Sequence, residues 1–245
     1  RNVISRNWWK GIGIWSGSNN NVIIGNYIGV TADGTAALGN FQSNIMLGNG
    51  STGNRFGGPT VGERNVISGA VYDGIEITGG SNNTIVQGNY IGTNAAGTAG
   101  LGNARWGIYS DSQSTTISGN VVSGNGGDGI RFAGSSNNTV QGNYVGTNAA
   151  GTAAIANGGN GVSISAASNN NLIGGTTAAA RNIFSGNGPW CCTGVYVDNS
   201  TGNTIQGNYI GTDVTGTVRI PNRFGIFFRG VTNTTIGGTA IGAGN

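Results

Sequence analysis

Apolar residues along this chain come in short pairs, with one residue between the two members of each pair. Eight such pairs occur, one with serine as its second member: Ile12/Ile14, Ile45/Leu47, Ile75/Ile77, Ile108/Ser110, Ile130/Phe132, Val162/Ile164, Val195/Val197 and Ile226/Phe228. Apolar positions that alternate briefly and are broken by Gly and Asn predict short β-strands joined by tight corners. No helical period is present, so we expect an all-β protein.

A longer repeat groups these pairs into modules. GNYIGV at 25–30 returns as GNYIGT at 88–93, GNYVGT at 142–147 and GNYIGT at 207–212. With RNVIS at 1–5 and its copies, these segments predict one domain over 1–245, built from four two-coil modules that start at residues 1, 64, 119 and 181. The second module, 64–118, is short because the insertion seen as GGPTVGER (57–64) and GGTTAAAR (174–181) is absent at 114–120. Such short strands bury their apolar side chains only by stacking on the next coil, which predicts a β-solenoid.

The N-x-I-x-G-N-x-I…G-I-x-I pattern resembles the right-handed parallel β-helix repeat of pectate-lyase-like proteins and of many secreted bacterial surface proteins. The resemblance implies a single right-handed parallel β-helix. The eight pairs predict about eight coils, and no cap is evident in the sequence. The asparagines that follow glycine are expected to stack at a corner as an amide ladder: Asn26, Asn89, Asn120, Asn143 and Asn208.

The two ends of the chain are in phase with each other. Aligning Gly237 and Gly238 with the insertions puts Gly244 where Arg64 and Arg181 stand. We therefore expect either a fragment of a longer protein or open ends that stack on further copies, end to end or side by side. Residues that we expect at such contacts are Trp8, Trp9, Trp15, Trp190, Cys191 and Cys192. The adjacent cysteines are open to a vicinal disulfide, two thiols or a bond between chains.

Composition excludes several classes of chemistry and partner. The chain contains 50 Gly and no His, so His-based acid–base catalysis, Ser-His-Asp triads and Cys-His nucleophiles are excluded. The net charge of +3 comes from scattered basic residues, which argues against a nucleic-acid partner. No apolar run approaches the ~18 residues of a membrane span. The chain starts without a signal sequence, as a mature form or a fragment does.

Residues at equivalent places of successive coils form outward columns, and acidic residues gather in two of them. The outward residue of each pair and the residue just before each pair's glycine bring six side chains of coils three to five together, with Asp111 beside them: Asp73, Glu76, Trp106, Tyr109, Asp128 and Arg131. Aromatic rings stack on sugars and carboxylates accept hydrogen bonds from sugar hydroxyls. Trp106, Tyr109 and Asp111 are therefore candidates for glycan binding. An enzyme would use Asp73, Glu76, Asp128 and Arg131, and Asp73 and Asp128 would lie roughly 10 Å apart, near the carboxylate spacing of inverting glycoside hydrolases.

Three observations weigh against catalysis and cofactors. The local acid motifs of polygalacturonase-like and pectate-lyase-like relatives are absent, and a solvated face with weak ion pairs explains the same residues. Asp33 and Asp213 share one loop position, which suggests calcium, but a calcium site takes six to eight oxygens and Asx turns account for one acid per loop. We therefore expect no metal or other cofactor.

The sequence accordingly predicts an extracellular or cell-surface β-solenoid with a structural or adhesive role and head-to-tail stacking into filaments. The alternative is a polysaccharide lyase, a glycoside hydrolase or a glycan-binding β-helix domain.

Overall fold

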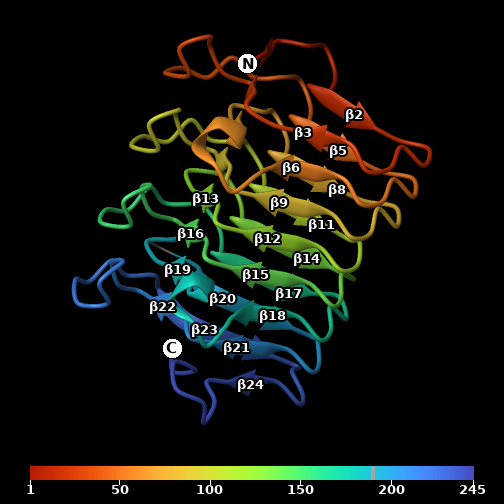
Figure 1. The fold of residues 1–245 in the computed structure, drawn as a ribbon. Helices are drawn as coiled ribbons and strands as arrows, with labels where there is room; N and C mark the ends of the chain where they lie inside the picture. The colour runs from red at the N-terminus through yellow and green to blue at the C-terminus, as the bar shows by residue number, and fades with distance from the viewer. Residues whose placement is uncertain (189–190) are drawn as a thin grey trace.

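The computed structural model describes residues 1–188 and 191–245 and forms a right-handed parallel β-helix, as the sequence predicts. In the described residues the strands form three parallel sheets of eight strands each. Successive strands along the chain belong to successive sheets, so each coil gives one strand to each sheet and eight coils stack along the axis (Figure 1).

The strands are two to six residues long, which is why each coil depends on its neighbours. Sheet A holds the strand that opens each coil: β1 (Val3–Ile4), β4 (Tyr27–Ile28), β7 (Val66–Ile67), β10 (Tyr90–Ile91), β13 (Val121–Val122), β16 (Tyr144–Val145), β19 (Ile183–Phe184) and β22 (Tyr209–Ile210). Sheet B holds the second strand: β2 (Ile12–Ile14), β5 (Ile45–Leu47), β8 (Ile75–Ile77), β11 (Ile108–Ser110), β14 (Ile130–Ala133), β17 (Val162–Ser165), β20 (Thr193–Asp198) and β23 (Phe224–Arg229). Sheet C holds the third: β3 (Val22–Ile23), β6 (Arg55–Gly57), β9 (Ile85–Gln87), β12 (Thr116–Ser118), β15 (Thr139–Gln141), β18 (Leu172–Gly174), β21 (Thr204–Gln206) and β24 (Thr235–Ile236).

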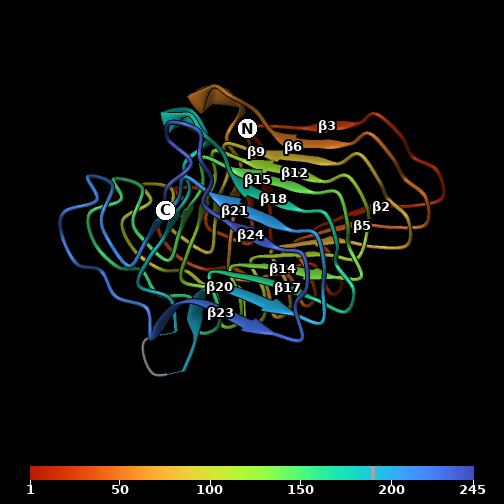
Figure 2. The same ribbon diagram turned by 90° about the horizontal axis from the view of Figure 1, so that it is seen from below.

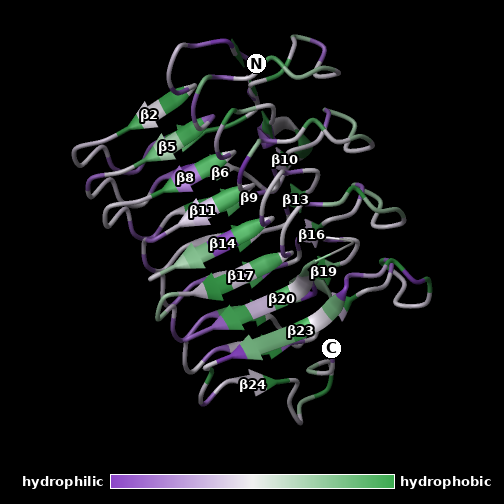
Figure 3. Ribbon diagram, turned by 180° about the vertical axis from the view of Figure 1, so that it is seen from behind, coloured by the Kyte–Doolittle hydropathy of each residue, from purple (hydrophilic) through white to green (hydrophobic). Residues whose placement is uncertain are grey.

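The core is a narrow column of stacked side chains enclosed by the three sheets. Figure 2 shows the stacked coils from below. The predicted apolar pairs lie on sheet B, and in the six inner coils both members of each pair are buried. The bulkiest side chains of the core are those of Phe56, Phe132 and Phe184, which are completely buried. Along sheet B these inward positions alternate with more polar outward ones, which Figure 3 shows as changes of colour within a strand. The inward side is thus committed to packing, and the outward side is free to carry function.

A ladder of nine asparagines runs along the corner that precedes sheet A, as predicted. Each amide Oδ1 accepts a hydrogen bond from the backbone N–H of the asparagine one coil earlier, at 2.9–3.3 Å. The members are Asn2, Asn26, Asn65, Asn89, Asn120, Asn143, Asn182, Asn208 and Asn245. The ladder satisfies backbone groups that the bend removes from sheet hydrogen bonding.

Two kinds of loop leave the coils. The insertions carry short 3₁₀ turns, η1 (Val61–Glu63) and η2 (Ala178–Ala180). The loops 31–40, 93–103, 147–157 and 212–222 project from one side (Figure 1) and stack on one another. For example, Ala95 N–H donates to the Gly34 carbonyl at 2.9 Å, and Ala149 N–H donates to the Gly97 carbonyl at 2.9 Å. Within residues 1–188 and 191–245, no helix has the length and apolar character needed to cross a membrane.

Candidate functional site

The outward side of sheet B carries the chemistry that the sequence singled out, and we call it the sheet B face. Strand pairing places the predicted residues in one column, in the order Gly13, Met46, Glu76, Tyr109, Arg131, Ser163, Tyr196 and Phe227. A second column begins three residues earlier in each coil and contains Lys10, Ser43, Asp73, Trp106, Asp128, Asn160, Thr193 and Phe224. The predicted columns are therefore confirmed.

A tryptophan pair holds a lysine at the N-terminal part of this face. The Trp9 and Trp15 rings stack with centroids 5.6 Å apart, and Lys10 Nζ lies 5.1 Å and 5.3 Å from their centroids. The ammonium also contacts the Met46 sulfur and lies 3.9 Å from the Glu76 carboxylate. Burial lowers the pKa of Lys10 from its usual value. The two rings and the carboxylate thus fix this charge in place.

Glycine makes room for the Trp15 ring. A Cβ on Gly13 would lie 2.5 Å from the Trp15 ring, and one on Gly48 would lie 3.0 Å from it. The ring therefore lies across the first two coils only because these positions lack side chains.

The centre of the face is a second aromatic cluster with two arginines. Trp106 and Tyr109 stack with ring centroids 4.9 Å apart. The Arg105 and Arg131 guanidinium carbons lie 4.1 Å and 4.9 Å from the Trp106 centroid, and Arg105 is also 5.4 Å from the ring of Tyr72. Two cations are thus held against one indole, an arrangement that favours guanidinium over ammonium.

The carboxylates of Asp73 and Asp128 serve the adjoining coil. Trp106 N–H donates to Asp73 Oδ1 at 3.1 Å, and Asn160 N–H donates to Asp128 Oδ1 at 2.7 Å. The other oxygen of Asp128 forms an ion pair with Arg131 at 3.1 Å. Asp73 is 2% exposed and Asp128 is 6% exposed. The two carboxylates proposed for catalysis therefore lie beneath the surface and are bound by the protein itself.

Burial shifts the pKa values of Asp73, Asp111 and Tyr109. It raises the pKa of Asp73 to about 6, although the hydrogen bond from Trp106 opposes the shift. Burial also raises the pKa of Asp111, which accepts the Gly79 N–H at 3.0 Å. The pKa of Tyr109 is raised by burial and by the nearby Asp111. Glu76 accepts the Ser43 hydroxyl at 2.8 Å.

The C-terminal part of the face is an aromatic hollow. The rings of Tyr196 and Phe227 stack at 6.0 Å, and Phe224 lies 5.7 Å from Phe227. Together with Asn160, Thr193 and the cysteine pair, they line a cavity of about 320 Å³. Cys191 and Cys192 are joined to each other by a disulfide, which decides among the three states that the sequence left open.

The remaining sequence candidates lie elsewhere. Trp8 is 86% exposed and packs on Phe41 outside the two columns, whereas Trp190 is outside the described residues. Asp33 accepts Thr35 N–H at 3.1 Å and Asp213 accepts Val218 N–H at 3.1 Å, so both carboxylates close their own loops. Sequence reasoning missed Arg105 and Tyr72 as parts of the face. Their only signal was an arginine next to Trp106, because Arg105 lies outside the repeated columns.

The family model described as periplasmic copper-binding protein (NosD) matches residues 101–245, which is more than half of the chain. The chain belongs to the NosD family. The matched part contains Arg105, Trp106, Tyr109 and Arg131, the aromatic hollow and the last two modules. No curated protein matches the chain.

Two solved structures are similar at 14% sequence identity. One is a mutant of the periplasmic alginate epimerase AlgG, with a TM-score of 0.46 over 91% of this chain and 58% of that one. The other is the A-module of the Azotobacter vinelandii mannuronan C-5 epimerase AlgE4, with a TM-score of 0.44 over 87% of this chain and 57% of that one. The chain spans less than two thirds of the length of each.

Proposed function

We propose that this chain is a non-catalytic polysaccharide-binding β-helix that holds an extended glycan along the sheet B face. The observation that carries the proposal is the regular placement of stacked rings with fixed charges on one flat face. Rings occur around coil one (Trp9 and Trp15), coil four (Trp106 and Tyr109) and coils seven and eight (Tyr196 and Phe227). Three coils separate one cluster from the next, which is roughly 14 Å. An extended polymer parallel to the axis meets all three clusters.

The groups around the rings suit hydroxyl recognition. Arg105 and Arg131 are positioned by stacking, so they lose little conformational entropy when they donate hydrogen bonds to a ligand. The Lys10 side chain is only 7% exposed, so it orders the two tryptophan rings beside it rather than donating to a ligand. The nearby acids balance these charges rather than leaving one sign in excess. This balance favours a neutral or weakly charged glycan over a highly charged one.

The burial and the backbone hydrogen bonds of Asp73 and Asp128 favour binding without turnover. A general acid or base needs an oxygen within reach of the bond it cleaves. Asp73 and Asp128 are instead almost fully buried and accept backbone N–H groups of the next coil. Their positions suit a structural acceptor better than a proton donor to substrate.

Copper does not enter the proposal, although the family description names it. Copper sites in proteins use imidazole, thiolate or thioether ligands. This chain has no His and one Met, and that Met46 sulfur contacts the Lys10 ammonium. Its two cysteines are joined to each other, and the described residues contain no group of three or more His, Cys, Asp or Glu that could hold a metal. The residues of this chain therefore do not fit a copper site.

A location outside the cytoplasm, in the periplasm or beyond it, is part of the proposal. The family description names the periplasm. The disulfide between Cys191 and Cys192 is compatible with an oxidising compartment.

Affinity electrophoresis in gels that contain neutral or acidic polysaccharides tests the proposal. We expect retardation by at least one neutral glycan, and at least a tenfold weaker retardation for a Trp106→Ala/Tyr109→Ala variant that keeps its circular dichroism spectrum. Trp8→Ala is the matched control, because it removes an exposed indole outside the columns. Equal retardation of the double variant, or release of reducing ends or unsaturated sugars, contradicts non-catalytic binding at this face.

Stacking of copies into filaments is a second candidate. The observation behind it is the asparagine ladder, in which each coil accepts a backbone N–H of the coil before it, as a coil of a second copy would. Electron microscopy of the purified chain at neutral pH tests it. Filaments with an axial repeat near eight coil spacings, roughly 40 Å, support stacking. Discrete particles at all concentrations contradict it.

A further inference from the structure

Four tyrosines recur at one outward position of sheet A, one in each module: Tyr27, Tyr90, Tyr144 and Tyr209. One side of each ring packs on a glycine of the projecting loop that follows it. A Cβ on Gly34, Gly97, Gly151 or Gly216 would lie 2.9–3.2 Å from the ring concerned.

The other face of three of these rings is covered by an arginine. The guanidinium carbons of Arg1, Arg64 and Arg181 lie 4.2, 4.0 and 4.0 Å from the centroids of Tyr27, Tyr90 and Tyr209. Two of these arginines also donate a hydrogen bond to the carbonyl of the glycine that precedes a ladder asparagine. Arg64 Nε donates to the Gly88 carbonyl at 3.3 Å, and Arg181 Nε donates to the Gly207 carbonyl at 3.2 Å.

Tyr144 lacks this partner. Gly119 occupies the place of the arginine in the third module, and in the part of the chain that the structure describes no cationic side chain lies over Tyr144. The cause is the missing insertion. The insertions bring Arg64 and Arg181 to the corner with φ of −60° and −64°, whereas Gly119 turns the corner with φ of +65°. Residues other than glycine are strained in that conformation.

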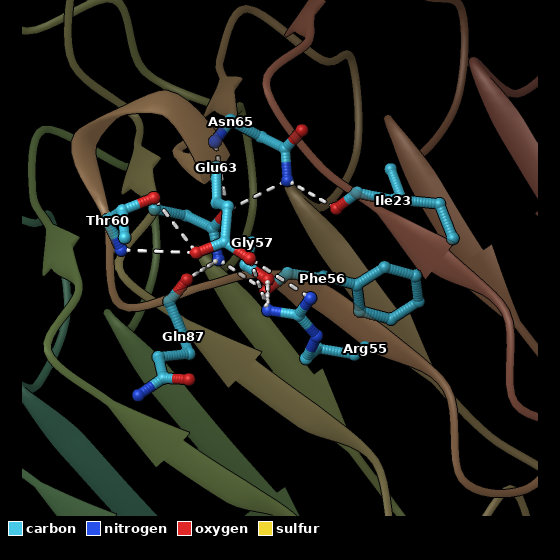
Figure 4. A network of polar contacts seen from close by, with 9 residues as sticks. Ile23, Arg55, Phe56, Gly57, Thr60, Glu63, Asn65 and Gln87 are labelled. Atoms are coloured by element: carbon cyan, nitrogen blue, oxygen red, sulfur yellow. Dashed lines mark hydrogen bonds and ion pairs between the residues drawn. The ribbon is translucent and has the colours of Figure 1, made fainter.

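The insertion that ends at Arg64 is held by polar contacts among Arg55, Thr60 and Glu63 (Figure 4). Arg55 donates to Glu63 at 3.1 Å, and Glu63 also accepts the Thr60 hydroxyl at 2.9 Å. These contacts hold η1 in place. Arg64 directly follows η1, so its backbone and side chain start from a fixed position. No equivalent segment precedes Gly119, where a Cβ would meet no atom within 4 Å.

Open space lies over the uncovered ring. A cavity of about 190 Å³ is lined by Gly119, Gly142, Tyr144 and Arg64. A second cavity, of about 360 Å³, shares Gly142 and Tyr144 and reaches Arg181. Gly142 corresponds to Gly88 and Gly207, so its carbonyl stands where the other modules hold the acceptor for Nε.

We propose that the open face of Tyr144 binds a guanidinium group supplied by a ligand, in the place that Arg1, Arg64 and Arg181 fill on the other three tyrosines. The structure shows a guanidinium on this ring position three times, and twice it also shows the guanidinium donating to the corner carbonyl. Charge repulsion from Arg64 and Arg181 does not prevent a guanidinium from binding over Tyr144. Each is two coils from Gly119, roughly 10 Å, which is the spacing that Arg1 and Arg64 already have. Both arginines are partly exposed, and physiological salt weakens the repulsion between charges that are farther apart than a Debye length of about 8 Å.

The guanidinium can come from an arginine side chain of a polypeptide or from a small guanidino compound. Both present the same planar donor group, which stacks on aromatic rings better than an ammonium does. Only a polypeptide adds backbone contacts along the cavity. The two sources are therefore separable by affinity.

The test is ligand-observed and protein-observed NMR on the full chain. With ¹³C-labelled tyrosine, ethylguanidinium should shift the Tyr144 ring signals saturably, and ethylammonium at equal ionic strength should shift them at least fivefold less. Saturation transfer to ethylguanidinium should be lost in Tyr144→Leu and kept in Tyr144→Phe. Tyr27→Leu is the matched control, because Arg1 already covers that ring, and it should keep the transfer.

The outcomes separate the alternatives. Ac-Gly-Arg-Gly-NH₂ that binds at least tenfold more tightly than ethylguanidinium identifies a polypeptide arginine as the natural occupant, and equal binding identifies a small compound. Equal shifts from both cations, or unchanged transfer in Tyr144→Leu, overturn the proposal. It is also overturned if glucuronate shifts Tyr144 and ethylguanidinium does not, since the site would then select an anionic sugar. The wild-type titration decides even if Tyr144→Leu fails to fold.

Discussion

Replacing Asp73 with asparagine should stabilise the protein at neutral pH. Asp73 is buried, and its pKa is raised to about 6 from 3.8. Below pH 3.8 the carboxyl is protonated in the folded and the unfolded chain, so it contributes no penalty. Between pH 3.8 and about 6 the unfolded chain ionises this carboxyl while the folded chain keeps it protonated, so the free energy of unfolding falls across this range and stays lower at higher pH. At about 1.4 kcal/mol per pKa unit, the folded state loses about 3 kcal/mol by pH 8.

Asparagine keeps the acceptor and removes the charge. Asn160 shows that an amide fits this column, because its Oδ1 accepts the Thr193 N–H at 2.9 Å. We therefore expect Asp73→Asn to raise the melting temperature at pH 8 by several degrees, since about 1 kcal/mol shifts it by ~2–4 °C in a chain of this size. The gain should shrink towards zero at pH 4.

Thermal unfolding followed by circular dichroism from pH 4 to pH 8 measures this difference. Asp128→Asn is the matched control, because it removes a carboxylate from the same column but leaves Arg131 without its ion pair. That variant should not gain stability. A melting temperature of Asp73→Asn that is no higher than wild type at pH 8, or a difference that does not change with pH, refutes the reasoning.

Three further predictions concern the ladder, an exposed ion pair and copper. Asn120→Ala should lower the free energy of unfolding by about 3 kcal/mol or more, because it leaves the buried Asn89 N–H without its 2.9 Å acceptor. Asn2→Ala, at the exposed end of the ladder, should lower it by less. Equal losses of the two variants in thermal unfolding contradict the ladder argument. Arg229→Ala should leave the melting temperature unchanged within error, because the side chain is 66% exposed despite its 2.8 Å contact with Asp198. Loading with Cu(I) or Cu(II), desalting and elemental analysis should give far less than one copper per chain, and a stoichiometric ratio contradicts our reading of the ligand set.

The register of the coils was predictable from the sequence because a solenoid turns periodicity directly into position. Once the modules were aligned, residues at one module position had to lie in one column, and strand pairing places Glu76, Tyr109 and Arg131 side by side. The asparagine ladder followed in the same way from its place after glycine. Both inferences needed only repetition, and neither required knowledge of side-chain conformations.

The local geometry of the face was not predictable in this way. The sequence placed Asp73 and Asp128 on outward columns, which suggested exposure, but both lie at the start of a strand where the next coil needs an acceptor. The contact of Arg105 with Trp106 depends on rotamers of a residue outside the columns. Trp15 crosses two coils because of glycines whose importance only the ring position reveals.

The second column of sheet B distinguishes what the fold needs from what it merely tolerates. Asp73, Asp128 and Asn160 each accept a backbone N–H of the following coil, so the fold needs an acceptor there. It does not need a charge, because the amide of Asn160 serves equally well. At Asp73 the charge is costly, since burial disfavours it. Stability therefore explains the oxygen at this position but not the carboxylate, and the unexplained charge lies directly beneath Trp106 and Arg105. This local cost is what we expect where a surface is built for a ligand rather than for the core.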